Sequence, residues 1–231
     1  NTYNTAVGYD AGQQVTTGVN NTIMGGLAGD ATTTGDLNTF IGYDAAGTNV
    51  GGDLNVIVGA GAAVAATGGD AAVGLGPNLS CVAEFTTLGS GASDIRAAHG
   101  NVTWATVSDE RVKKDIEDAT VGLAFINDLR PVTFNYKNKG DLPENFRGYE
   151  EGSTEVYKNS KSQHGFIAQE VKAAIDKHSD IKDGFSMWDD DDLTGQQRVG
   201  ETAIVPMLTK AMQELSTALD AALARIATLE G

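Results

Sequence analysis

The sequence predicts a mixed fold made of two unlike halves. We expect the N-terminal half to be an all-β repetitive, trimeric fibre of the β-solenoid or β-roll type. The C-terminal half is expected to be an α+β domain that ends in a coiled-coil helix. Three observations predict this: a glycine-rich repeat up to residue 107, an abrupt change of charge at Ser108, and a heptad pattern near the C-terminus. The expected domains are 1–107, 108–202 and 203–231.

The repeat is visible from its asparagine. The stretch that starts at Asn4 and ends in Gly8 recurs from Asn21, Asn38 and Asn55, a spacing of 17 residues that we expect to shorten to 15 afterwards. Each unit has a β-prone stretch that ends in Gly and leads to a Thr/Gly turn, which predicts very short strands stacked about 4.8 Å apart. Stacking should align the repeated Asn and Thr as hydrogen-bond ladders. It also predicts an interior apolar ladder: Val7, Met24, Ile41, Val58, Val73 and Leu88.

Such a coil encloses little apolar volume. One large apolar residue and a few alanines per turn bury too little to offset the ordering entropy of the chain. We therefore expect several chains, three in number, to share the interior. A β-solenoid closed by a single chain is the alternative.

Composition excludes several kinds of partner. Residues 1–107 hold 8 acidic residues, 1 basic residue and 20 of the 29 glycines, whereas the remainder holds 23 acidic and 15 basic residues. The net charge of −15 argues against nucleic acid as a partner. No apolar run reaches the about 18 residues that membrane insertion needs. The chain starts without Met or a signal-peptide pattern, as expected of a piece of a longer protein.

No metal or cofactor is expected. Cys81 is the sole cysteine, so a cysteine-rich zinc site cannot form within the chain. The run Asp189–Asp192 is interpreted as a solvated loop rather than a cation site. We interpret the aspartates of the repeats in the same way: Asp10, Asp30, Asp36, Asp44 and Asp53.

The junction that begins at Ser108 has two interpretations. It fits a helix start, with Ser108 or Asp109 as the N-cap and acids in the first turn. It also fits a nucleophile and base, since a neutral Lys can take the proton of a Ser hydroxyl. A lysine normally has a pKa of about 10.4, so burial or nearby cations must favour its neutral form. Arg111 and Lys114 are the candidate cations, and spacing alone does not decide between the two interpretations.

Two further segments are informative. The polar stretch between Lys137 and Gln163 is a long loop inside a domain, which is typical of functional or disordered segments. The stretch from His164 to Glu170 is interpreted as a buried strand at Phe166–Ala168 that leads into an Ala-rich helix. We assign it a packing role rather than a catalytic one.

The C-terminal segment predicts a helix with a heptad seam. Its apolar positions are separated by alternating steps of three and four, which is typical of a coiled coil. A helix folded onto its own domain is the alternative. The seam consists of Val205, Leu208, Met212, Leu215, Leu219, Ala222, Ile226 and Leu229.

Taken in order, these segments resemble a known family. It is the intramolecular chaperone auto-processing domain, or peptidase S74 domain, of phage tail fibres and tailspikes. The similar stretches cover nearly all of 108–231, and the upstream repeats resemble those of tail-fibre shafts. The stretches are Ser108–Ile116, Gly122–Tyr136 in part, His164–Val171 and Gln213–Leu215.

The resemblance implies a chaperone that cuts its own chain. Such a domain drives trimerisation and folding of the preceding fibre, then cleaves once before the motif Ser. Carried over, Ser108 is the nucleophile, Lys113 is the base and Val107-Ser108 is the cleaved bond, with Asp109 and Arg111 in orienting or electrostatic roles. An N-to-O acyl shift followed by hydrolysis and a Ser-Lys-assisted attack by water both remain open.

The resemblance also implies partners and a location. The chain would assemble with itself as a homotrimer in the host cytoplasm, reside in the virion, and meet a host cell-surface glycan or protein. The loop 137–163 would be an arm that grips the adjoining fibre. One alternative is a non-cleaving structural or receptor-binding fibre with a permanent cap. Another is a glycan hydrolase, which needs paired carboxylates that the repeat does not offer.

Overall fold

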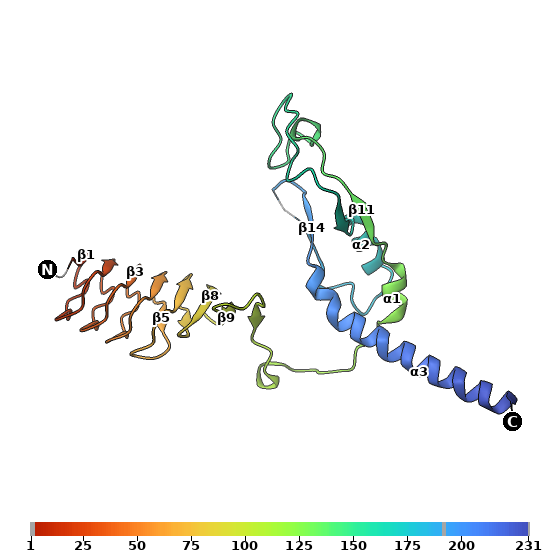
Figure 1. Cartoon of the computed structure of the whole chain (residues 1–231), viewed down its shortest axis with the longest axis horizontal. Coiled ribbons are helices and arrows are strands. Elements are labelled where there is room, and N and C mark those ends of the chain that lie inside the picture. Colours follow the sequence, from red (N-terminus) through yellow and green to blue (C-terminus); the bar gives the residue numbers. More distant parts are fainter. Residues whose placement is uncertain (1–2, 191–192, 231) are drawn as a thin grey trace. The chain divides into compact units, whose positions relative to one another are not determined.

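The computed structural model describes residues 3–190 and 193–230 and divides the chain into two compact units, 1–115 and 116–231. Figure 1 shows the first unit as a stack of coils and the second as a mixed unit that ends in a long helix. This arrangement confirms the predicted fold class of a β-solenoid followed by an α+β unit with a C-terminal helix. The domain boundary expected before Ser108 lies within the first unit and stays a prediction.

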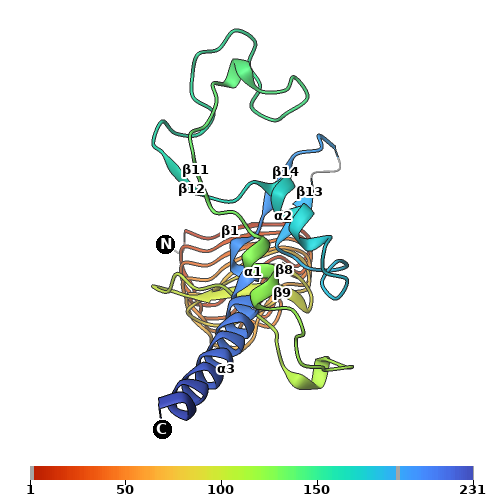
Figure 2. The ribbon, with the colours of Figure 1, turned by 90° about the vertical axis from the view of Figure 1, so that its right-hand side faces the viewer.

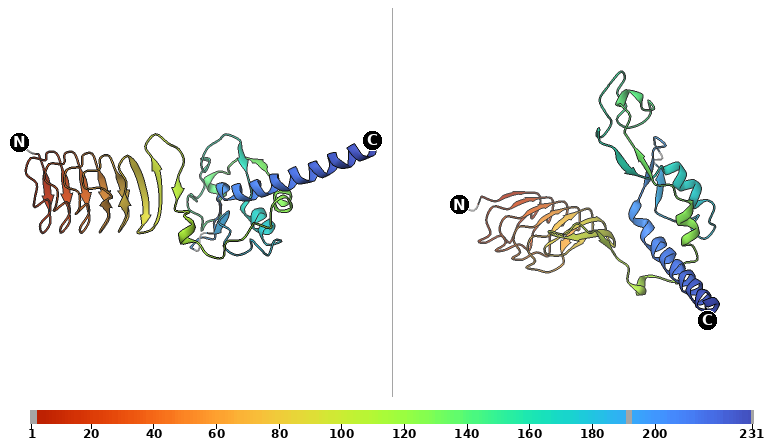
Figure 3. Two further views of the ribbon diagram at one scale, coloured as in Figure 1. Left: turned by 90° about the horizontal axis from the view of Figure 1, so that it is seen from below. Right: turned by 45° about the vertical axis from the view of Figure 1, so that its right-hand side comes forward.

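The first unit is a solenoid whose strands form one parallel sheet that ends in an antiparallel hairpin (Figure 3, left). Strand β8 pairs in parallel with β6, and β9 and β10 then add in antiparallel order. A second short parallel pair joins β5 and β7. The strands are β1 (Thr5–Val7), β2 (Thr22–Met24), β3 (Thr39–Ile41), β4 (Val56–Val58), β5 (Ala63–Val64), β6 (Val73–Leu75), β7 (Ser80–Cys81), β8 (Phe85–Ser90), β9 (Ser93–Ala98) and β10 (Ala105–Thr106).

The spacing of the coils differs from the prediction after the fourth strand. Val58 pairs with Leu75, a spacing of 17, and Leu75 pairs with Leu88, a spacing of 13. The predicted change to 15 is therefore wrong. Two steps of 15 residues lead from Gly59 to Gly89, and so do a step of 17 followed by a step of 13. The spacing of the glycines therefore did not distinguish the two patterns. Ala72 takes the place of the repeated Asn, because its N–H donates to Asn55 Oδ1 at 2.8 Å.

The repeated asparagines form a buried hydrogen-bond ladder, as expected. Asn38 Oδ1 accepts from the backbone N–H of Asn55 at 2.9 Å, and its Nδ2 donates to the carbonyl of Gly52 at 2.8 Å. Asn21 and Asn55 make the equivalent bonds one coil away. Each amide thus satisfies backbone groups that would otherwise be buried without partners.

The predicted apolar ladder lies on the outer side of the strands, so its placement in the interior is wrong. Side chains alternate along a strand, so a three-residue strand turns its middle residue inward and the two flanking residues outward. Ile23, Phe40 and Ile57 are the middle residues and are at most 1% exposed. Val7 and Met24 lie on the outer face and are 54% and 46% exposed, and Val73 belongs to a different row from Val58.

The interior of each coil is filled by one chain. The inward residues pack against small residues from the turns in a single buried cluster, so the coil closed by a single chain, the alternative named above, is the one observed. At the corners, Gly25 has a φ of +135° and a Cβ there would lie 2.3 Å from the carbonyl oxygen of Gly42. Glycine is therefore required for the coils to stack this closely. The cluster includes Ile23, Ala28, Phe40, Ala45, Ala46, Ile57, Ala62, Val64, Ala72, Leu79 and Cys81.

The second unit is built around Phe125 and α2. In α2, Val171, Ala174 and Ile175 follow the spacing of one helix face and are buried against Phe125. Strand β12 ends at Gly165 and Ala168 already begins α2, so the strand predicted at Phe166–Ala168 is wrong. The helices are α1 (Leu123–Asp128), α2 (Ala168–Ile175) and α3 (Val205–Glu230), and the strands are β11 (Val132–Phe134), β12 (Gln163–Gly165), β13 (Trp188–Asp190) and β14 (Gln197–Val199).

Helix α3 docks on this unit through its first turns alone. Ala211 is buried, Met207 packs against the core, and Glu214 Oε2 accepts from the backbone N–H of Leu123 at 2.8 Å, which caps the start of α1. From Leu215 onward every described residue of the helix is exposed. Figure 2 shows this distal part of α3 running out beyond the elements that pack on its first turns.

Candidate functional site

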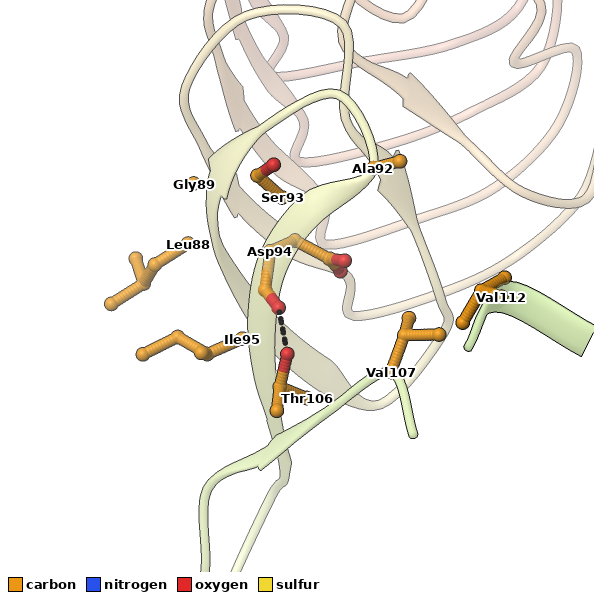
Figure 4. Close-up of a pocket in the computed structure, with 9 residues that line it drawn as sticks. All are labelled: Leu88, Gly89, Ala92, Ser93, Asp94, Ile95, Thr106, Val107 and Val112. Carbon is orange, nitrogen blue, oxygen red and sulfur yellow. Dashed lines mark hydrogen bonds between the residues drawn. The ribbon is translucent and has the colours of Figure 1, made fainter. Parts of the chain in front are cut away.

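The predicted cleavage junction follows directly on the last paired strand of the solenoid unit. Strand β10 pairs with β9, and Thr106 Oγ1 donates to the backbone carbonyl of Asp94 at 3.2 Å (Figure 4). Val107 comes next and its side chain is 57% exposed. The backbone is therefore held in the sheet as far as Thr106. The predicted cleavage bond, between Val107 and Ser108, lies between two exposed residues.

A short 3-10 helix, η1 (Glu110–Val112), shapes the chain after this bond. Asp109 is its N-cap, and Oδ1 of Asp109 accepts from the backbone N–H and from Nε of Arg111, both at 2.9 Å. Arg111 Nη2 also donates to Asp109 Oδ2 at 2.7 Å. These bonds from Arg111 hold the pKa of the Asp109 carboxyl below its usual value, and the same pair raises the pKa of Arg111.

The turn brings Ser108 and Lys113 together. Lys113 is the C-cap residue of η1, and its Nζ donates to Ser108 Oγ at 2.7 Å. The geometry thus contains a helix start and also a contact between the predicted nucleophile and base. The cap of the helix is Asp109 rather than Ser108. Five residues of chain suffice for the contact because η1 folds them into a single turn.

The surroundings of this pair are open and charged. Residues 108–115 are all exposed, so the described part of one chain does not bury the Lys113 ammonium. Arg111 is paired with Asp109, and Lys114 Nζ lies 3.9 Å from Asp115 Oδ2. Both predicted cationic neighbours thus have a carboxylate close by. Base catalysis requires that the proton pass along this contact from the Ser108 hydroxyl to a neutral Lys113 amine.

An open pocket of about 760 Å³ lies beside Val107 (Figure 4). Its apolar wall is formed by Leu88, Ile95, Val107 and Val112, and Asp94 stands at its polar edge. Sequence reasoning missed this pocket because it did not predict the β8–β9 hairpin. The available signal was two β-prone stretches on either side of Gly91.

The separated motif segments of the second unit meet in space. Strands β11 and β12 pair in antiparallel order, and Arg130 Nε donates to Glu170 Oε2 at 3.0 Å, which lowers the pKa of the Glu170 carboxyl. His164 is exposed on β12, with Nδ1 3.3 Å from Thr133 Oγ1. Phe166 packs against the core, whereas His164 and the Arg130–Glu170 pair lie on the surface.

Contacts among its own side chains help to hold the long loop between β11 and β12. Lys139 Nζ donates to Glu150 at 2.9 Å and to Glu155 at 2.8 Å. Lys158 Nζ lies 5.2 Å from the centre of the Tyr136 ring, at the base of the loop. Figure 2 shows the loop extending away from α1 and α2.

Neither a metal centre nor a membrane span is found in the described part of the chain. Across residues 3–190 and 193–230, no group of three His, Cys, Asp or Glu side chains could hold a metal ion. Asp189 and Asp190 are exposed on β13, and Asp191 and Asp192 lie outside the described residues. None of the helices in the described ranges is both long enough and apolar enough to cross a bilayer.

A family model matches part of the chain. Residues 108–180 match the family model Peptidase_S74, described as the chaperone of endosialidase. The match begins at Ser108, the residue that the Lys113 side chain contacts. No curated protein and no solved structure matches the chain.

Proposed function

With a chaperone-of-endosialidase domain that begins at Ser108, we propose that this chain is the tip of a phage tail fibre that assembles as a homotrimer and then cleaves itself once. The 108–202 domain and the helix of 203–231 would drive the folding of the shaft formed by 1–107. The match to the chaperone of endosialidase supports a chaperone role in a phage tail fibre. The observation that supports self-cleavage is the Lys113–Ser108 hydrogen bond of 2.7 Å beside the last shaft strand.

The chemistry needs few groups because the substrate is the chain itself. Lys113, as the neutral amine, takes the proton from Ser108 Oγ, which adds to the carbonyl carbon of Val107. In the acyl shift the bond from that carbon to the Ser108 nitrogen breaks, the nitrogen takes up a proton, and an ester forms that water hydrolyses. In the other route, water is the attacking group and the same two residues polarise it. Asp109 and Arg111 keep the turn closed in both routes.

Assembly offers a means of activating the lysine. The ammonium of Lys113 is exposed in one chain, and covering it with other copies would remove water and favour the neutral amine. Cleavage would then follow trimerisation rather than precede it. The fibre would assemble in the host cytoplasm and reside in the virion. Its further partner would be a glycan or protein of the host cell surface.

Denaturing gels and mass spectrometry test the proposal directly. The purified wild-type chain is expected to yield fragments 1–107 and 108–231, and Ser108→Ala and Lys113→Met are expected to remain intact. Lys182→Met is the control, because Lys182 is also exposed and is not one of the cations expected to act on Lys113. Cleavage in Ser108→Ala, or equal loss in Lys182→Met, would contradict the assignment.

The second candidate is a fibre that keeps its chaperone as a permanent cap. The exposure of Ser108 and Lys113 favours it, because the described part of one chain places nothing around the pair that would activate the hydroxyl. A wild-type chain that stays intact as a stable trimer after long incubation would select this candidate.

The arm, loop 137–163, has a test of its own. Deletion of 140–155 is expected to slow trimer assembly if the arm grips the adjoining fibre. Unchanged assembly in that variant would remove the arm from the proposal.

A further inference from the structure

The outer face of the solenoid sheet is a continuous surface without charge. It consists of the two residues that flank the inward residue of each strand, and we call it the outer sheet face. Strand pairing aligns these residues in two straight rows. One row is Thr5, Thr22, Thr39, Val56, Val73 and Thr86, and the other is Val7, Met24, Ile41, Val58, Leu75 and Leu88.

This face differs from the other sides of the coil. The turns carry carboxylates in every one of the first four coils, including the exposed Asp44, whereas neither row of the outer sheet face contains an ionisable residue. The chain has a net charge of −15, so copies of it repel one another in general. Contact through a face without charge avoids placing carboxylates opposite carboxylates, which costs free energy.

The face continues to the cleavage junction. Leu88 closes the second row on β8, Ile95 pairs with it across the β8–β9 hairpin, and both line the pocket that contains Val107. Ile95 is 43% exposed. The apolar surface of the shaft therefore ends at the residue before Ser108, within a single compact unit.

We propose that the outer sheet face is the surface through which copies of this chain pack on one another in the shaft, and that the contact extends along Leu88 and Ile95 to the apolar wall of the pocket beside Val107. A partner must present apolar groups that repeat about every 4.8 Å along a straight line of about 24 Å. Another copy of the same sheet, parallel and in register, has this spacing. The inference rests on the homotrimer of the proposed function and assigns its interface.

Cysteine crosslinking in the full chain tests the proposal without disturbing the fold. In a parallel in-register assembly, Met24→Cys places identical thiols on neighbouring copies close together, whereas Val50→Cys places them on the turns, outside the sheet. The Val50 side chain is 41% exposed, similar to that of Met24. A bismaleimide reagent is expected to link Met24→Cys into covalent dimers at least tenfold more than Val50→Cys.

The native thiol does not interfere. Burial, with the Asp94 charge as a smaller cause, raises the pKa of Cys81 to about 11, so the reactive thiolate is scarce. Wild type treated with the reagent is the control for this residue. Equal crosslinking of Met24→Cys and Val50→Cys, or more in Val50→Cys, would overturn the proposal.

A second pair of variants measures the interface by charge. Val58→Glu places a carboxylate in the second row of the outer sheet face. Val50→Glu places the same group on a turn, outside that face. Val58→Glu is expected to give monomers by light scattering with the β signal in circular dichroism retained, and Val50→Glu is expected to assemble like wild type. If Val58→Glu still assembles and Met24→Cys is not linked, the interface lies elsewhere although the homotrimer stands. If wild type is itself monomeric, the homotrimer of the proposed function fails.

Discussion

At the residue scale, the geometry at Ser108 depends on a side chain that does not react. Asp109 accepts from the backbone N–H of Arg111 and pairs with its guanidinium, and this pair closes the turn that carries Lys113 back to Ser108. Since Asp109 contacts neither the hydroxyl nor the amine, we regard it as a positioning residue. A displacement of about 1 Å is enough to lower a rate markedly.

The role of Asp109 can be separated from a charge effect. Asp109→Ala is expected to slow the appearance of fragment 108–231 by about tenfold or more, because the cap and the pair are both lost. Asp109→Asn keeps an oxygen that can accept from the Arg111 N–H and is expected to recover most of the rate. Densitometry of timed gel samples gives both rates. No difference between the two variants would show that the cap does not position Lys113.

A second carboxylate at the residue scale links stability to pH. The hydrogen bond from Lys177, then that from His178, holds the pKa of Asp128 below its usual value. The folded form therefore favours the ionised carboxyl, and this stabilisation is present above a pH of about 4 and is lost as the pH falls through the lowered value. Asp128→Asn is expected to lower the melting temperature of the chain at pH 7 and to have much less effect at pH 2. Melts followed by circular dichroism measure this, and equal effects at both pH values would contradict it.

At the scale of elements, the coils of β2, β3 and β4 are each held by one inward side chain and one buried asparagine amide. Phe40 is fully buried in the middle of β3, while Tyr43, two residues beyond that strand, is 62% exposed. Removing each of these two rings in turn therefore tests whether the interior formed by one chain stabilises the solenoid.

Phe40→Ala is therefore expected to destabilise the first unit by about 3–5 kcal/mol, because a cavity remains where the ring was. Tyr43→Ala, which removes a ring of similar size from the surface, should change the free energy of unfolding by about 0.5 kcal/mol or less. Urea unfolding of the full chain, followed by the β signal in circular dichroism, compares the two. Similar losses in both variants would mean that the interior is not the one described.

Helix α3 has a docked part at its start and an exposed part beyond it. Its first turns pack on the second unit through Met207 and Ala211, which lie off the predicted seam, and the large apolar residues of the seam are exposed along the whole helix, from 42% at Leu208 to 84% at Leu229. The predicted coiled coil stays a prediction. The alternative of a helix folded onto its own domain describes the first turns well, and from Leu215 onward no described residue of α3 is buried.

At the scale of the whole molecule, assembly and cleavage are expected to be coupled. Leu215→Asp places a charge in the open part of the seam and is expected to give monomers by light scattering and to abolish cleavage together with assembly. Ser216→Asp adds the same charge one residue off the seam and should assemble and cleave like wild type. A monomeric Leu215→Asp chain that still cleaves at the wild-type rate would show that one chain supplies the whole site.

The fold class and the residues of the junction could be predicted from the sequence, since each depends on local pattern. The repeated Asn and Gly fix a coil because a buried amide and a left-handed corner are needed at the same place in each turn. Likewise, Ser108 and Lys113 lie in one short motif, where five residues can close a turn. The pocket beside Val107 could not be found in this way, because it forms between β8, β9 and a segment beyond β10.

By itself, the sequence determined that the first half coils and that the second half is an α+β unit with a long helix. Only the tertiary structure decided which side of each strand faces inward and how the last coils are spaced. The physical reason is that a strand of three residues offers an apolar side chain to either face, as Ile23 and Met24 do, and local pattern is the same for both choices. The choice is made when the coil closes, because Ile23 and Phe40 then meet the small residues of the turns while Met24 is left outside.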